Sequence, residues 1–159
     1  MRVLKREDLA PAWRADPAVL CVAGRSLLDE AAAVAMAHLT EVYGIVAKAE
    51  PSEALANTNI VRLQPDGVQV VCLVHLGDEV SSHTRFAIRR LKRRMPKARI
   101  MLCWWSGRID EETAERRRLE ARADLIATSP SHALTILLDA AASVPFTAQP
   151  ESEPAEVAK

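Results

Sequence analysis

The most strongly β-branched run in the chain is Val68-Gln-Val-Val-Cys-Leu-Val-His75. A continuous apolar run of this length is typical of a strand that is buried on both faces of a parallel sheet. Two similar runs, Val19-Leu-Cys-Val-Ala-Gly24 and Arg99–Trp105, and two shorter ones, Ile45–Ala49 and Leu125–Ser129, flank it along the chain. The sequence therefore predicts five strands, with Val68–His75 as a central one.

Helical patterns separate most of these strands. Apolar residues recur at helical spacing from Leu28 to Tyr43, which predicts a helix whose inward positions include Leu28 and Met36. The segment Ser52–Leu63 stays open between a helix and a loop, because Asn57 and Asn59 oppose the helical pattern. The other predicted helices run from Ser81 or Ser82 to Pro96, onward from Asp110-Glu-Glu112, and from Ser129 or Ser131 through Leu138.

Strands that alternate with helices predict an α/β fold in which right-handed crossovers cover both faces of a parallel sheet. For five strands, the order 2-1-3-4-5 of a three-layer flavodoxin-like domain is the expected topology. This domain should span residues 18–143, after an irregular lead-in at 1–17 and before a disordered tail, rich in Pro, Glu and Ala, at 144–159. The cysteines at 21, 72 and 103 would then be small buried apolar side chains on adjacent strands.

The overall composition fits one globular domain. The 159 residues include 21 Lys and Arg and 21 Asp and Glu, and 49% are hydrophobic. A net charge of zero argues against a generally basic nucleic-acid binder and against a highly charged disordered chain. No apolar run reaches the roughly 18–20 residues of a membrane helix, no secretory h-region follows the N-terminus, and the cysteines show no disulfide spacing. We therefore expect a cytoplasmic protein.

The zero net charge is a cancellation between two halves. Residues 1–80 carry 7 basic and 11 acidic side chains, whereas residues 81–159 carry 14 and 10. No acid occurs between Glu79 and Asp110, and apolar positions of the intervening helix should face inward while its basic residues face outward. Outward-facing arginines of an amphipathic helix are usually only solvated, but eight positive charges within Arg85–Arg99 without one acid exceed what solubility needs. The candidate partners are an acidic protein surface, an anionic membrane leaflet or nucleic acid. The candidate docking residues are Arg85, Arg89, Arg90, Arg93, Arg94 and Lys97.

A second candidate site lies where the predicted strands end. In an open parallel sheet, ligands bind at the carboxyl ends of the strands near the point where the strand order reverses. Trp104 and Trp105 should place one ring under each helix layer, because successive strand residues point to opposite faces. The candidate ligand-binding residues at this edge are Arg25, Ser26, His75, Ser81, Ser82, Trp104 and Ser106.

Several specific chemistries are disfavoured at this edge. The loop Gly24-Arg-Ser-Leu27 is neither a dinucleotide-binding glycine loop nor a P-loop. A phosphoacceptor receiver needs an acidic cluster after its first strand and an Asp at the end of its third strand, and these places hold Gly24-Arg25 and His75. The Asp-x-His-x-x-Gly motif that cobalamin-binding domains carry after the first strand is missing. We expect no catalytic residue, no metal and no cofactor.

Four segments together resemble a known family: Val19–Ala33, Val70–His75, Phe86–Pro96 and Asp124–Ser129. They are similar to the soluble domain that follows the transmembrane part of some bacterial transporters of the autoinducer-2 exporter (PerM-like permease) family. The resemblance implies a non-catalytic, regulatory accessory domain at the cytoplasmic face of the membrane. Its partner would be a membrane protein or an anionic membrane surface, and nucleic acid is not expected. The alternative is a small-molecule-binding protein or enzyme that uses the strand-end loops. The sequence does not set the oligomeric state.

Overall fold

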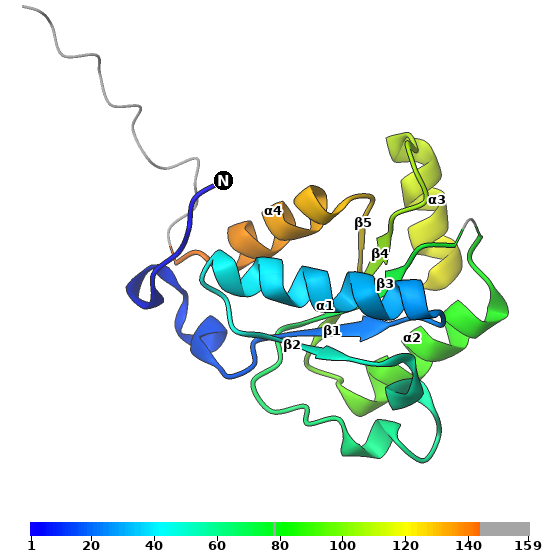
Figure 1. Cartoon of the computed structure of the whole chain (residues 1–159), viewed down its shortest axis with the longest axis horizontal. Coiled ribbons are helices and arrows are strands. Elements are labelled where there is room, and N and C mark those ends of the chain that lie inside the picture. The colour runs from blue at the N-terminus through cyan, green and yellow to red at the C-terminus, as the bar shows by residue number, and fades with distance from the viewer. Residues whose placement is uncertain (78, 144–159) are drawn as a thin grey trace, which may run out of the picture.

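Five parallel strands form a single sheet in the order β2-β1-β3-β4-β5 (Figure 1). The computed structural model describes residues 1–77 and 79–143. The predicted strand order and the three-layer flavodoxin-like fold are confirmed, and β2 begins two residues later than expected. The strands are β1 Val19–Ala23, β2 Ala47–Glu50, β3 Val70–His75, β4 Arg99–Trp104 and β5 Leu125–Ala127.

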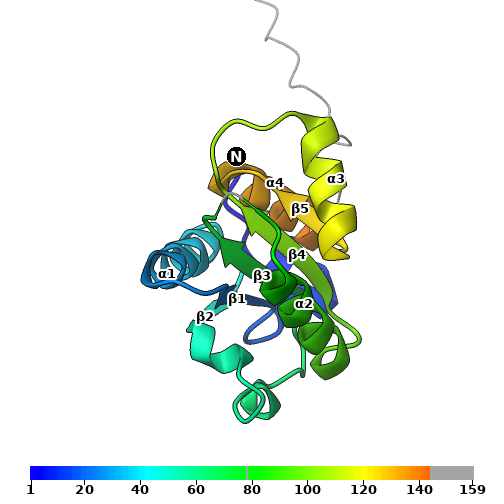
Figure 2. The ribbon, with the colours of Figure 1, turned by 90° about the vertical axis from the view of Figure 1, so that its right-hand side faces the viewer.

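Helices cover both faces of this sheet, as Figures 1 and 2 show. Two of them, α1 and α4, pack on one face with the N-terminal segment, and α2 and α3 pack on the other. Each face has its own apolar cluster, because successive residues of each strand point to opposite sides. The helices are α1 Leu27–Val42, α2 Ser82–Arg94, α3 Glu111–Ala121 and α4 Pro130–Ala141.

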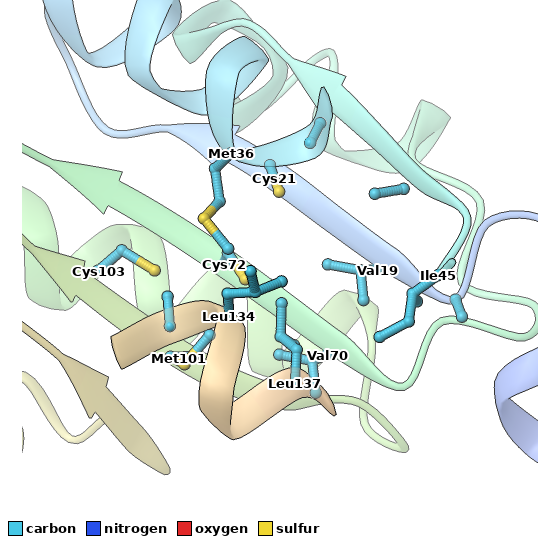
Figure 3. Close-up of a cluster of buried hydrophobic side chains, with 14 of the residues drawn as sticks. Val19, Cys21, Met36, Ile45, Val70, Cys72, Met101, Cys103, Leu134 and Leu137 are labelled. Atoms are coloured by element: carbon cyan, nitrogen blue, oxygen red, sulfur yellow. The ribbon is translucent and has the colours of Figure 1, made fainter. Parts of the chain in front are cut away.

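Three cysteines lie side by side in the core beneath α1 and α4 (Figure 3). Cys21 is paired in register with Cys72, and Cys103 lies on the next strand. All three are 0% exposed, which confirms the predicted burial. Contact with a neighbouring thiol, and then burial, raise the pKa of Cys21 and of Cys72 well above its ordinary value. Cys21 and Cys72 therefore behave as small apolar side chains and not as reactive thiolates.

The inward face of α1 differs from the predicted one. Leu28, expected to point inward, is 70% exposed, and the buried positions begin instead at Asp29. The carboxylate of Asp29 accepts backbone hydrogen bonds from two strand-end loops, and this fixes the rotation of the helix. As a result, Leu27 and Leu28 face away from the core.

The connection between β2 and β3 contains two short 3-10 turns, Ser52–Leu55 and Ile60–Arg62, in place of an α-helix. Leu55 and Leu63 are nonetheless buried against the face of the sheet that α2 covers. This connection therefore fills the place of a crossover helix with short 3-10 turns, whose backbone hydrogen bonds are local, such as Ala54 N–H to Pro51 C=O.

The segment 1–17 is irregular, and it still contributes to the core. It forms two 3-10 turns, and the side chains of Leu4, Leu9 and Trp13 are buried in the cluster beneath α1 and α4. Leu9 also forms an isolated antiparallel bridge with Ala142, just beyond α4. The predicted disordered tail, 144–159, lies outside the described residues.

Candidate functional site

Asp29 organises the carboxyl edge of the sheet. Its Oδ2 accepts the backbone N–H groups of Arg25 and Ser26 at 2.9 and 3.0 Å, and its Oδ1 accepts that of Leu76 at 2.9 Å. Asp29 is 2% exposed, so burial opposes its ionisation, but these three hydrogen bonds outweigh burial and the pKa lies below its ordinary value. One carboxylate thus ties the β1–α1 loop to the β3–α2 loop.

His75 is enclosed at the same edge. Its Nδ1 lies 3.7 Å from Asp29 Oδ2, and its side chain is 16% exposed. A Cβ at Gly24 would lie 3.3 Å from Nδ1, and a Cβ at Gly77 would lie 2.6 Å from Nε2. Both glycines therefore allow close approach to the ring, and the imidazole is held between the two loops.

The predicted strand-end residues divide into two groups. Ser26 and Ser81 are N-caps, since their side chains accept the backbone N–H groups of Asp29 and Thr84. Arg25 and Ser82 are exposed, and Ser106 is half-buried. The imidazole Nε2 of His83 lies 3.3 Å from the Gly24 carbonyl oxygen, and the ring forms no hydrogen bond with the neighbouring Ser82. Ser82 and His83 therefore do not form a nucleophile and its base in this structure.

The two tryptophans lie on opposite faces of the sheet, as predicted. Trp104 belongs to the cluster beneath α2 and α3, and Trp105 packs against the one beneath α1 and α4. The Trp104 indole N–H donates to the carbonyl of Gly77, and the Arg117 guanidinium lies 4.7 Å from the centre of the Trp104 ring. Trp104 is 2% exposed, so its role is packing.

The basic helix α2 carries arginines of two kinds. Arg90 donates to the carbonyl of Leu55, and Arg94 donates to those of Leu63 at 2.9 Å and Val61 at 2.7 Å. These two side chains hold the irregular β2–β3 connection against α2. Although both were predicted to dock a partner, their guanidinium groups are occupied inside the molecule.

The remaining arginines of α2 border a groove between α2 and α3. Arg85, Arg89 and Arg93 are exposed and line it, and the groove encloses about 670 Å³. The apolar side of the groove consists of Ile88, Leu119 and Ala121; Leu119 is 60% exposed, whereas Ile88 and Ala121 are each 1% exposed. Figure 2 shows the two helices on the same side of the sheet. We call this feature the α2–α3 groove; it is lined by Arg85, Ile88, Arg89, Lys92, Arg93, Leu119, Glu120, Ala121 and Arg122.

The lining charges of the α2–α3 groove are mostly positive. It has five cationic side chains and one carboxylate, that of Glu120, which also pairs with Arg117 at 3.3 Å. Lys92 lies 3.5 Å from Asp124. Among residues 1–77 and 79–143, no carboxylate lies within ion-pair distance of Arg85, Arg89, Arg93 or Arg122. The groove therefore combines a cationic rim with an apolar wall.

The sequence-based candidates include three of the nine lining residues of this groove; the six that they miss are Ile88, Lys92, Leu119, Glu120, Ala121 and Arg122. Leu119 and Arg122 lie at the C-terminal end of α3, and Arg122 adopts the left-handed conformation that ends the helix. The available signal was Leu119 itself, an apolar residue within the charged run Glu115–Glu120. Lys97, in contrast, lines a separate cavity of about 290 Å³ with Pro65–Gln69.

The described residues hold no cluster of three or more His, Cys, Asp or Glu side chains suited to a metal ion. None of the helices in that part of the chain is long and apolar enough to cross a membrane. A scan against protein-family models and a search of curated proteins give no match to this sequence.

Proposed function

We propose that this protein is a non-catalytic partner-binding domain, and that the α2–α3 groove docks an acidic, amphipathic segment of another protein. The observation that carries the proposal is the composition of the groove: five cations and one carboxylate around the apolar side chains of Ile88, Leu119 and Ala121. An amphipathic helix binds a groove of this kind by placing its apolar face on the wall and its charges at the rim.

The shape of the surface favours a protein segment over a flat membrane leaflet. A groove between two helices surrounds an inserted side chain, whereas a lipid surface would meet only the outermost cations.

The family resemblance suggests where such a segment occurs. If the chain acts as the accessory domain of an autoinducer-2 exporter family transporter, the partner is a cytoplasmic segment of a membrane protein. The domain would then act at the cytoplasmic face of the membrane and regulate transport by binding or releasing that segment. An anionic leaflet is the competing partner, and the same experiment separates the two.

A binding assay with two double variants tests the proposal. The probe is a fluorescent synthetic helix with Glu on one face and Leu on the other, and the control peptide has the same composition in scrambled order. Arg89→Gln with Arg93→Gln should weaken binding of the amphipathic helix about ten- to a hundredfold, because two ion contacts worth roughly 0.7–1.4 kcal/mol each are lost. Arg6→Gln with Arg62→Gln removes the same charge from exposed arginines elsewhere and should leave affinity unchanged.

Raising the salt concentration should weaken binding of the helix, because exposed ion pairs are screened. Equal affinity for both double variants, or for the scrambled peptide, would contradict the proposal. Binding to phosphatidylserine vesicles without binding to the acidic helix would assign the cationic rim to a membrane instead.

A further inference from the structure

The outward face of α1 is unusually apolar for a surface helix. Leu27, Leu28, Val34 and Val42 are 82%, 70%, 59% and 52% exposed. These four residues extend from the first to the last position of the helix, over roughly 22 Å at 1.5 Å per residue. Scattered exposed leucines need no explanation, but a row along one whole helix face marks an interaction surface.

The rest of this face consists of small residues with charge confined to its ends. Ala31 and Ala35 are exposed along its middle, where they allow another helix to approach closely. The exposed polar side chains of α1 are His38 and Glu41, both toward its C-terminal end. The exposed Arg25 lies just before its N-terminus. We call this surface the α1 face.

The charges at the two ends of the α1 face identify its partner. When two copies of α1 pack antiparallel about a twofold axis near Val34, the N-terminal end of one helix lies against the C-terminal end of the other. Arg25 of each copy then meets Glu41 of the other, and the positive end of each helix dipole lies beside a negative end. In this arrangement the apolar residues of the two α1 faces contact each other and their end charges have opposite signs. The α1 face is therefore self-complementary, as a twofold interface requires.

We propose that a second copy of this chain covers the α1 face and forms an antiparallel helix pair across a twofold axis. The neighbouring edge strand β2 does not provide the interface, because Lys48 is exposed on it and pairs with Glu50 at 3.0 Å. The α1 face lies on the opposite side of the sheet from the α2–α3 groove. The dimer therefore leaves both grooves open, and its existence does not depend on the proposed function.

The test is the mass of the full chain in solution, measured by light scattering and by sedimentation at several concentrations. The expected mass of the wild type is twice 17.4 kDa at tens of micromolar. Val34→Glu places a charge at the middle of the α1 face and should give a monomer. Val61→Glu is the matched control, since Val61 is 61% exposed in the β2–β3 connection and should leave the dimer intact.

A charge exchange tests the antiparallel arrangement. Arg25→Glu alone and Glu41→Arg alone should each raise the dissociation constant about tenfold, and the double variant should restore it to within about threefold of wild type. A wild type that stays monomeric at 200 µM, or a Val34→Glu variant that still dimerises while keeping its melting temperature, would overturn the proposal. Dimerisation without restoration by the double variant would overturn the antiparallel geometry.

Discussion

Replacing Arg90 and Arg94 together by glutamine should destabilise the fold, because these side chains hold the β2–β3 connection in place. The pair donates three hydrogen bonds to the carbonyls of Leu55, Val61 and Leu63. Both arginines are half-buried, and the freed carbonyls can be rehydrated, so we assign about 1 kcal/mol to each bond. The expected loss is about 3 kcal/mol, from a free energy of unfolding of roughly 5–15 kcal/mol for a typical domain.

Urea denaturation followed by circular dichroism measures this loss, and thermal melting should show a fall of roughly 6–12 °C. The matched control is Arg89→Gln with Arg93→Gln, which removes the same charge from the exposed, groove-lining side of the same helix. It should change the free energy of unfolding by no more than about 0.5 kcal/mol, as surface substitutions usually do.

Equal destabilisation by the two double variants would refute this division of α2 into a structural side and a binding side. So would a loss of less than about 1 kcal/mol in the Arg90 and Arg94 variant. Replacing all four arginines at once would not distinguish the two roles, because a fall in binding would then include a contribution from unfolding.

Three further substitutions test the carboxyl edge of the sheet. Asp29→Asn should lower the free energy of unfolding by about 2 kcal/mol at pH 7. Because the folded-state pKa of Asp29 is lowered, the wild type should keep this stabilisation above about pH 4 and lose it on further acidification, whereas the variant should show a shallower pH dependence in urea melts. Gly77→Ala should cost about 1–3 kcal/mol through the close contact with His75, and less in a His75→Ser background, as a double-mutant cycle would show. Trp104→Phe should cost about 1 kcal/mol in the same assay, since it removes the hydrogen bond to the carbonyl of the half-buried Gly77.

The strands followed from the sequence because their signal is local, and the strand order followed from the topology usual for five strands that alternate with helices. A run such as Val70–His75 is apolar on both faces wherever it occurs, and a parallel sheet is the structure that buries both. Helix starts were equally local: Ser81, named as one of two possible caps, accepts the N–H of Thr84 three residues later. Interactions between neighbours in the chain can be predicted from spacing alone.

Two features could not be predicted because their causes lie far away in the chain. Asp29 points inward, in place of Leu28, because it accepts the N–H of Leu76, which is 47 residues distant. Spacing within the helix carries no information about that bond. For the same reason, nothing in the run Arg89–Arg94 separates the arginines that bind the carbonyls of Leu55 and Leu63 from those that remain exposed.

The candidate sites also combine features that neighbouring residues determine with features that depend on distant parts of the chain. The positive excess of α2 was visible in the sequence, but the groove also needs Leu119 and Arg122 from another helix. At the strand ends, Ser26 was proposed as a ligand contact, and its hydroxyl caps α1. Short polar residues at helix starts serve the backbone so often that a binding role for them requires geometry as evidence.

The buried row of Cys21, Cys72 and Cys103 has a practical consequence for labelling. In its folded form the chain should behave toward maleimides as a protein without cysteine, since thiol reagents need both access and a thiolate. A single cysteine introduced at Val34 would then carry a fluorophore or spin label against no background, and spin–spin distances would report directly on the α1 face. Three additional thiols should become reactive only when the sheet opens, which makes the native row an internal reporter of global unfolding.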